Sequence, residues 1–161
     1  FFLFCMAWYG AEGSVVRSFT LPELMREAHV VIVGTVESSQ SFWNDAGDTI
    51  YTEHTIKVTS THKGVAEKTI KVRLMGGRVG DKSLTISGNP SLEMGESVLL
   101  FLRKYDGFHT MVGMSQGKWS VRSSDGTEYV FRGSKREGPV PSADEIPLKR
   151  LLEMCNSPSG N

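Results

Sequence analysis

Four histidines are the residues of this chain best suited to metal or acid–base chemistry: His29, His54, His62 and His109. None stands at ligand spacing from another histidine, a cysteine or a carboxylate, as the H-x-x-x-H and C-x-x-C patterns of zinc sites require. His54 alternates with Ile50 and Ile56 in a strand-like segment, which favours a hydrogen-bonded core or barrel-mouth histidine. We therefore predict no metal ion and no cofactor.

Two short motifs match the sequence pattern of a phosphate-binding loop or a nucleophile elbow but lack the secondary structure that such sites require. The glycine-rich segment 76–80 lacks the Gly-Lys-Ser/Thr ending that opens a helix in phosphate-binding loops, and a strand-like segment follows it instead. Ser115 lies in a G-x-S-x-G pattern, but a nucleophile elbow needs a strand-to-helix turn, and strand signals flank Ser115 on both sides. We therefore predict no catalytic residue and a protein that is not an enzyme.

The alternative is a hydrolase, or a protease-accessory or inhibitor-like protein, whose site is assembled from dispersed residues. His54, Glu53 and Asp81 are the candidates for that site. Glu53 and His54 are neighbours in a strand-like segment, so their side chains are expected on opposite faces. The alternative therefore requires a carboxylate from another part of the chain to approach His54.

The charge balance argues against nucleic acid as a partner. Lysine plus arginine and aspartate plus glutamate number 18 each, whereas nucleic acids and anionic membranes are usually met by a basic excess. Aromatic and basic residues suited to single-stranded nucleic acid are present, such as Trp43, Trp119 and Arg132. The near-neutral charge balance makes such a use improbable, and we interpret Trp119 as a plug at one barrel end.

The first thirteen residues predict export. Residues 1–11 are apolar, uncharged and rich in aromatic side chains, and small residues precede Ser14, as in the core and cleavage region of a secretory signal. The alternatives are a buried helix or an uncleaved anchor, but eleven residues are too few to span a bilayer. We expect residues 1–13 to be a signal-peptide remnant, no membrane span after its removal, and a periplasmic or extracellular location.

Local patterns predict one short helix followed by strands. Thr20 and Glu23 have the spacing of a capping box, and the helix should end near His29. Residues 30–36 are apolar on both faces, which indicates a strand covered on both sides or bent at Gly34. Further strands are expected in 49–63, 69–74, 84–87, 98–102 and 109–114, a last hairpin in 117–132, and a terminal helix in 147–155.

About seven short strands after a single helical turn are typical of an all-β barrel or sandwich. We predict an all-β fold with minor helices: an OB-type antiparallel β-barrel over residues 14–133 with a short N-terminal and a C-terminal helix. Its alternate side chains should share one apolar interior. Residues 134–161 should form a polar linker, a short helix and a loose tail, with Cys155 acting as a small packed hydrophobe.

Four segments resemble the strand phrases of the netrin-like (NTR) superfamily, the OB-type barrel shared with tissue inhibitors of metalloproteinases. They are residues 28–36, 55–64, 70–74 and 92–103, within a likeness that covers Leu21 to Val121. Its most specific pieces are Lys63-Gly64, Gly76-Gly77, Gly95-Glu96 and Gln116-Gly117-Lys118. The likeness is closest to uncharacterised exported bacterial proteins, and it implies a barrel and an extracytoplasmic location.

The resemblance does not carry over the inhibitory mechanism of that superfamily. Tissue inhibitors chelate zinc through a disulfide-linked N-terminal cysteine, whereas the expected mature chain begins at Ser14 and has no cysteine before Cys155. We therefore expect a non-enzymatic binding module that contacts an extracytoplasmic protein through the loops 43–49 and 76–82. The candidate ligand-binding residues are Trp43, Asn44, Asp45, Arg78, Asp81 and Lys82.

Overall fold

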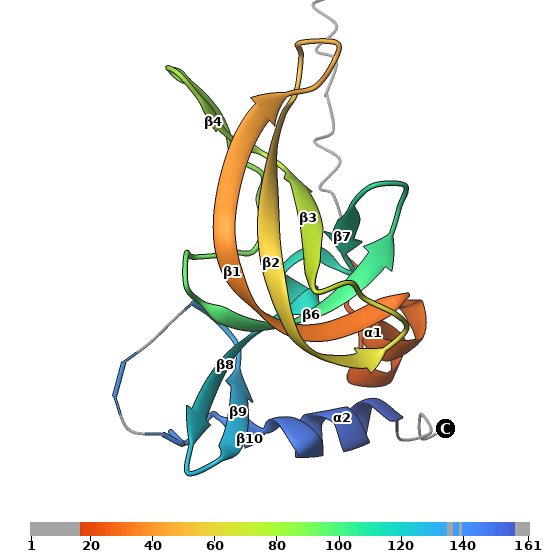
Figure 1. The fold of residues 1–161 in the computed structure, drawn as a ribbon, viewed down its shortest axis with the longest axis vertical. Coiled ribbons are helices and arrows are strands. Elements are labelled where there is room, and N and C mark those ends of the chain that lie inside the picture. The colour runs from red at the N-terminus through yellow and green to blue at the C-terminus, as the bar shows by residue number, and fades with distance from the viewer. Residues whose placement is uncertain (1–16, 135–136, 139, 157–161) are drawn as a thin grey trace, which may run out of the picture.

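The computed structural model describes residues 17–134, 137–138 and 140–156 (Figure 1). The expected signal remnant, residues 1–13, and most of the expected tail lie outside the described residues. Among the described residues, no helix is both long and apolar enough to span a bilayer.

The N-terminal helix α1 (Leu21–Glu27) forms as predicted. The Thr20 side chain accepts a hydrogen bond from the Glu23 backbone N–H, and the Glu23 carboxylate accepts from the Thr20 backbone N–H, which completes the capping box. The other end of the helix is bound by Lys63, whose Nζ donates to the carbonyl oxygen of Met25 at 2.6 Å. A positive charge at this position is favourable, because the C-terminal end of a helix is the negative end of its dipole.

Five strands close the predicted barrel: β1 (Val30–Trp43), β2 (Ile50–Lys63), β3 (Thr69–Met75), β7 (His109–Met111) and β6 (Ser97–Lys104). They are hydrogen-bonded in that order, and β6 pairs with β1 to complete the ring (Figure 1). The prediction of an all-β barrel with minor helices is confirmed. One detail was wrong, because the barrel is not wholly antiparallel: β3 and β7 run parallel. A closed ring with an odd number of strands cannot alternate direction throughout.

Two apolar cores replace the single interior that we expected. Alternate residues of β1 point into the barrel, where Val30, Ile32 and Val36 meet residues of β2, β3 and β6. The intervening residues Val31 and Val33 point outward and join a second core, which also contains α1. Residues 30–36 of β1 are therefore apolar on both faces because each face is covered, the first of the two explanations open from the sequence. The register with β2 also shifts between Val33 and Gly34, as the second explanation, a bend at Gly34, requires.

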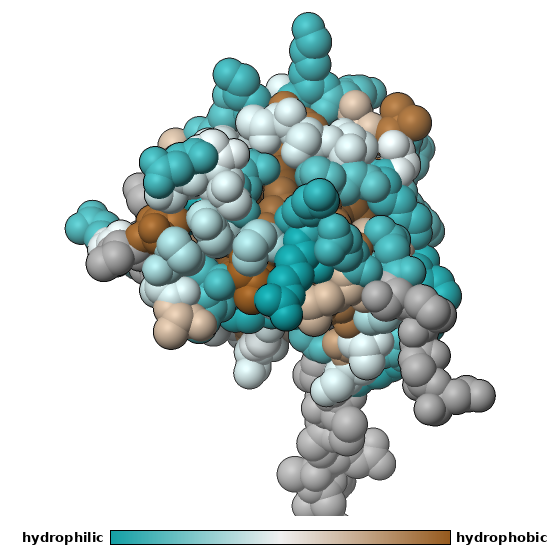
Figure 2. Space-filling view, turned by 90° about the horizontal axis from the view of Figure 1, so that it is seen from below, coloured by the Kyte–Doolittle hydropathy of each residue, from teal (hydrophilic) through white to brown (hydrophobic). Residues whose placement is uncertain are grey.

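The second core is closed by the C-terminal part of the chain. After the 3₁₀ turn η1 (Met114–Gly117), the strands β8 (Lys118–Ser124), β9 (Thr127–Phe131) and β10 (Ile146–Pro147) extend the sheet from β6, and α2 (Leu148–Asn156) follows. The helix α2 buries Leu148, Leu151 and Cys155 in this core. Burial raises the pKa of the Cys155 thiol to about 11, which fits its predicted role as a packed hydrophobe. Viewed from this end, the surface is mainly hydrophilic with small hydrophobic areas (Figure 2).

Candidate functional site

Two hairpins rise from the barrel end that lies opposite the second core (Figure 1). The first is the turn between β1 and β2, and the second is formed by β4 (Gly77–Val79) and β5 (Lys82–Leu84). The backbone N–H of Arg78 donates to Ser41 Oγ at 3.3 Å, so the second hairpin is tied to the side of the first.

Gly77 allows this close contact between the hairpins. Its φ of 135° is rare for residues with a side chain, and a Cβ atom at this position would lie 2.2 Å from Thr52 Oγ1 and 2.5 Å from Ser41 Oγ. Gly77 belongs to the Gly76-Gly77 pair of the family likeness. Its physical role is therefore to let β4 cross the hydroxyl groups of β1 and β2.

A pocket of about 550 Å³ lies between the β4–β5 hairpin, the loop 85–92 and the barrel interior. Its polar floor comes from β2, where Thr52 Oγ1 lies 2.8 Å from Ser41 Oγ and donates to the Gly76 carbonyl at 2.7 Å. Leu74 and Leu92 supply apolar walls. A pocket of mixed polar and apolar lining at a barrel mouth is typical of binding sites; we call it the mouth pocket.

His54 faces inward, as the alternation of β2 predicted, and lines the mouth pocket. It is buried, and its Nδ1 atom lies 2.6 Å from Ser39 Oγ on β1. Burial lowers the pKa of the imidazole, so the ring is neutral at pH 7 and presents one donor and one acceptor. His54 can therefore orient a polar group that enters the pocket.

Of the predicted ligand-binding residues, Arg78 lines the mouth pocket. Trp43 is 40% exposed at the end of β1. Asp81 and Lys82 lie at the tip of the second hairpin, where their charged groups are 4.0 Å apart and both side chains are exposed. Asp45 is exposed in the turn between β1 and β2. These residues share one end of the barrel but do not converge on one point.

Asn44 has a structural role in the first hairpin. Its side chain donates to Asp48 Oδ1 at 2.7 Å and accepts from the backbone N–H groups of Asp48 and Thr49. The bond from the Asn44 amide, together with one from the Thr49 hydroxyl, lowers the pKa of the Asp48 carboxyl group. Asn44 therefore orders the turn that carries its neighbours Trp43 and Asp45.

The residues proposed for the alternative enzyme site are not brought together. Glu53 lies on the outer face of the barrel, where it pairs with Lys71 at 2.8 Å and Arg73 at 2.9 Å. Burial would raise the pKa of Glu53, but the hydrogen bonds and charges of Lys71 and Arg73 outweigh it and lower the pKa. His54 faces the interior and Asp81 lies at a hairpin tip, so no acid–base pair forms from these three.

Sequence reasoning missed a buried ion pair beside the mouth. Lys118 Nζ donates to Glu96 Oε1 at 2.6 Å and to the Gly133 carbonyl at 2.9 Å, and Ser120 Oγ lies 2.6 Å from the same carboxylate oxygen. Lys118 and Glu96 are only 4% and 2% exposed. The available signal was the likeness itself, since Gly95-Glu96 and Gln116-Gly117-Lys118 are among its most specific pieces.

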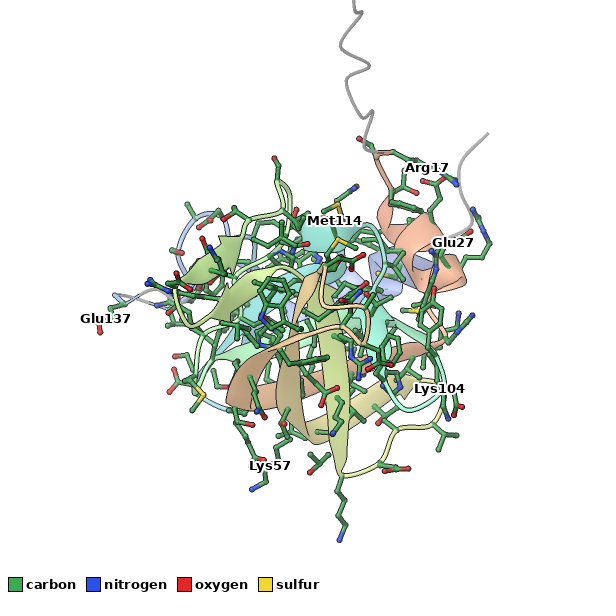
Figure 3. The ribbon with its side chains drawn as sticks, turned by 90° about the horizontal axis from the view of Figure 1, so that it is seen from above. Arg17, Glu27, Lys57, Lys104, Met114 and Glu137 are labelled. Atoms are coloured by element: carbon green, nitrogen blue, oxygen red, sulfur yellow. The ribbon has the colours of Figure 1, made fainter. Side chains whose placement is uncertain are left out.

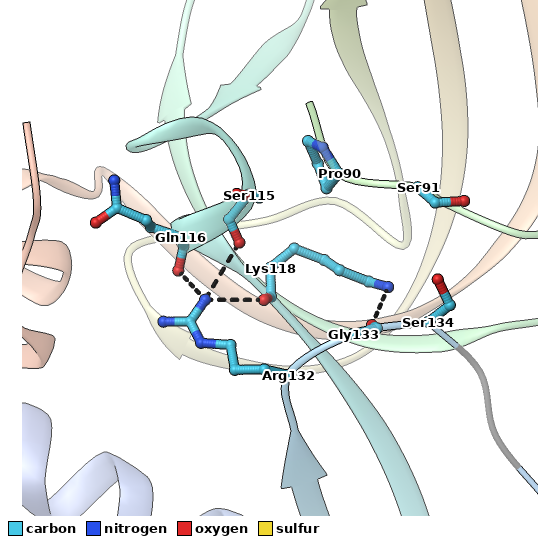
Figure 4. Close-up of a pocket in the computed structure, with 8 residues that line it drawn as sticks. All are labelled: Pro90, Ser91, Ser115, Gln116, Lys118, Arg132, Gly133 and Ser134. Carbon is cyan, nitrogen blue, oxygen red and sulfur yellow. Dashed lines mark hydrogen bonds between the residues drawn. The ribbon is translucent and has the colours of Figure 1, made fainter. Parts of the chain in front are cut away.

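A second pocket, of about 390 Å³, lies next to this ion pair (Figure 4). Arg132 borders it, with Nη1 within 3.2 Å of the carbonyl oxygens of Ser115, Gln116 and Lys118, and its guanidinium stacks on Trp119 at 3.9 Å. Burial lowers the pKa of Arg132. The contacts of Arg132 hold η1 against the end of β9, and Lys118 ties β8 to Glu96 and Gly133, so this region supports the fold next to the mouth.

No family model matches this chain, and the curated proteins and the solved structures provided no match either. The likeness to the netrin-like superfamily therefore stays a prediction. The barrel and the geometry of its mouth are the basis for a functional proposal.

Proposed function

We propose that this chain is an exported, non-enzymatic binding module that holds an extracytoplasmic protein between the two hairpins at the mouth of an NTR-like barrel. The proposal joins the expected signal remnant in residues 1–13 to the geometry of the mouth. The partner would contact Trp43 and Asp45 on the first hairpin and Arg78, Asp81 and Lys82 on the second.

One observation carries this proposal: both hairpins extend beyond the cores at the same barrel end, where the second hairpin, together with Thr52 and His54 of β2, lines a pocket of about 550 Å³. Trp43 supplies an exposed aromatic side chain, and Arg78 a guanidinium group, which are the residue types enriched in protein–protein hot spots. The hydrogen bonds of Asn44 and the contact between Arg78 and Ser41 preorganise both hairpins, which lowers the entropic cost of binding.

Site-specific photo-crosslinking in cells that naturally make the protein tests the proposal. A photoreactive residue is placed at Lys82 or Asp45, and, as the matched control, at the exposed Lys149 on α2. We expect one and the same protein to be crosslinked from Lys82 and from Asp45, and not from Lys149.

Affinity measurements with the identified protein complete the test. Replacement of residues 78–82 by glycine and serine should weaken binding by at least about tenfold, because hot-spot contacts are lost. Equal crosslinking from all three positions, or unchanged affinity of the replaced hairpin, would refute the proposal.

A further inference from the structure

The barrel has a weak seam between β3 and β7. These strands are bridged only at Val72 and His109, whereas β3 extends from Thr69 to Met75. His109 Nδ1 is buried at the seam, where the ring lies against the Lys71 backbone, but it has no hydrogen bond of good geometry in the described part of the chain. The seam therefore has fewer hydrogen bonds than the other contacts between the barrel strands.

The backbone of β3 leaves an open edge at this seam. The bonds from Val58 N–H to the Lys68 carbonyl and from Gly76 N–H to the Ile50 carbonyl fix the phase of the β2–β3 ladder. Because hydrogen-bonding direction alternates along a strand, even-numbered residues of β3 bond to β2, and Thr69 and Lys71 face the seam. The single bridge at Val72 engages the Lys71 carbonyl, whereas no strand in the described residues lies opposite Thr69. The N–H and carbonyl of Thr69 and the N–H of Lys71 therefore form a short edge that another strand can join.

A groove of about 350 Å³ runs along this edge, between β3, the loop 64–68 and the turn from β6 to β7. Its apolar wall is preformed, because Phe108 lies between the Tyr105 ring, stacked at 5.5 Å, and the Arg73 guanidinium at 4.3 Å. Val65 and Tyr105 are 86% and 49% exposed. A rigid aromatic wall beside exposed apolar side chains is suited to side chains of a bound segment.

The surroundings of the groove carry more basic than acidic groups: Lys57, Lys68, Lys71 and Lys104 lie on or beside it, against Glu53, Glu67 and Asp106. Glu53 is already paired with Lys71 and Arg73. Lys57 and Lys104 project from the outside of the barrel (Figure 3). This charge distribution favours an acidic ligand.

We propose that the seam is a second binding site, which takes an extended acidic peptide segment of another protein as an added strand along Thr69–Lys71. Acidic side chains of the peptide lie on the outer face beside Lys71 and Lys57, and the alternate apolar side chains enter the groove between Ile70 and Tyr105. Main-chain hydrogen bonds to the β3 edge hold the peptide, as in other cases of strand addition. This site is separate from the mouth pocket and does not depend on the function proposed for it.

A titration followed by nuclear magnetic resonance tests this inference with a synthetic peptide of alternating glutamate and valine, blocked at both ends. We expect its addition to shift the amide signals of Thr69 and Lys71 and to slow their hydrogen exchange. A peptide of the same sequence, N-methylated at alternate residues, should bind at least about tenfold more weakly, because it has the same charge but cannot pair along one edge.

Two variants test the wall and the charge. Tyr105→Ser and Lys104→Glu should each weaken binding several-fold, while the matched control Lys149→Glu on α2 should leave it unchanged. The inference is overturned if the N-methylated peptide binds as well as the parent, if a lysine–valine peptide binds equally, or if the shifts map to the two hairpins at the mouth.

Discussion

Replacement of Lys118 by methionine should be among the most damaging single substitutions in this protein. The change leaves Glu96 buried at 2% exposure, where Ser120 Oγ and the backbone N–H of Glu93 are its remaining hydrogen-bond donors among the described residues. Removal of one partner of a buried pair typically costs about 3–5 kcal/mol. Since domains of this size have a free energy of unfolding of about 5–15 kcal/mol, the variant should lose a large share of its stability.

Urea denaturation followed by tryptophan fluorescence measures this loss. With a slope of about 2 kcal/mol per molar urea, a cost of about 4 kcal/mol lowers the unfolding midpoint by about 2 M. The matched control is Lys82→Met, which removes an exposed lysine 4.0 Å from Asp81 and should cost less than about 1 kcal/mol.

The double variant Glu96→Gln/Lys118→Met separates the ion pair from simple loss of packing. It should be more stable than Lys118→Met alone, because no uncompensated charge remains in the interior. A cost of Lys118→Met below about 1 kcal/mol, or a double variant whose cost equals the sum of the single costs, would refute the assignment of Glu96 and Lys118 as a coupled buried pair.

Three further predictions concern the buried histidines, Gly77 at the mouth and the N-terminal helix. Burial lowers the pKa of His54 and of His109, so the folded state binds fewer protons than the unfolded state, and the free energy of unfolding should fall as pH decreases below about 6.5. Urea midpoints measured at several pH values should depend less on pH for His54→Gln than for the unchanged protein. An equal pH dependence of the two would contradict the buried position of His54. Gly77→Ala should lower the free energy of unfolding by about 2 kcal/mol because of the φ at this position, and by more because of the contact with Thr52. The control Gly47→Ala, at a φ of 71° in the exposed turn, should lower it clearly less. Equal melting temperatures of the two variants would contradict the close contact at Gly77. Thr20→Ala removes the helix cap and should cost about 1 kcal/mol in thermal denaturation, while Ser18→Ala, just before the helix, serves as the control that should have little effect.

Local patterns predicted the features that depend on neighbouring residues. The capping box of Thr20 and Glu23 lies within one helical turn, and the inward position of His54 follows from alternation along β2. The candidate residues were predicted to lie in loops, which holds for Asp45 but not for Trp43, Arg78 and Lys82, because these three belong to β1, β4 and β5. Trp43, Asp45 and Lys82 are exposed at the barrel end. Asn44 was predicted as a ligand-binding residue because its turn was recognised, but the sequence did not show that its side chain is used within that turn.

The contacts between distant segments could not be predicted in the same way. The sequence did not indicate that Glu96 and Lys118 are buried, because a charged side chain is rarely buried unless it has a partner. Here the two residues are each other's partner, and they lie 22 positions apart in the chain. The mouth pocket combines β2 with the loop 85–92, and the seam combines β3 with the turn before β7. Their residues share no periodicity in the chain.

The sequence by itself determined the elements: a capped helix, strands with alternating inward and outward side chains, and turns at glycines. It also showed that residues 30–36 of β1 are too apolar for either face to be exposed to water. The tertiary structure alone decided that β1 and β6 lie between two cores, that β3 and β7 meet in parallel at a single bridge, and that two hairpins emerge together at one end. Helix caps and side-chain alternation depend on residues that are adjacent in the chain, where backbone geometry restricts the choices. Closure of a ring of five strands depends on which distant edges find each other, and that is decided by the free energy of the whole packed barrel.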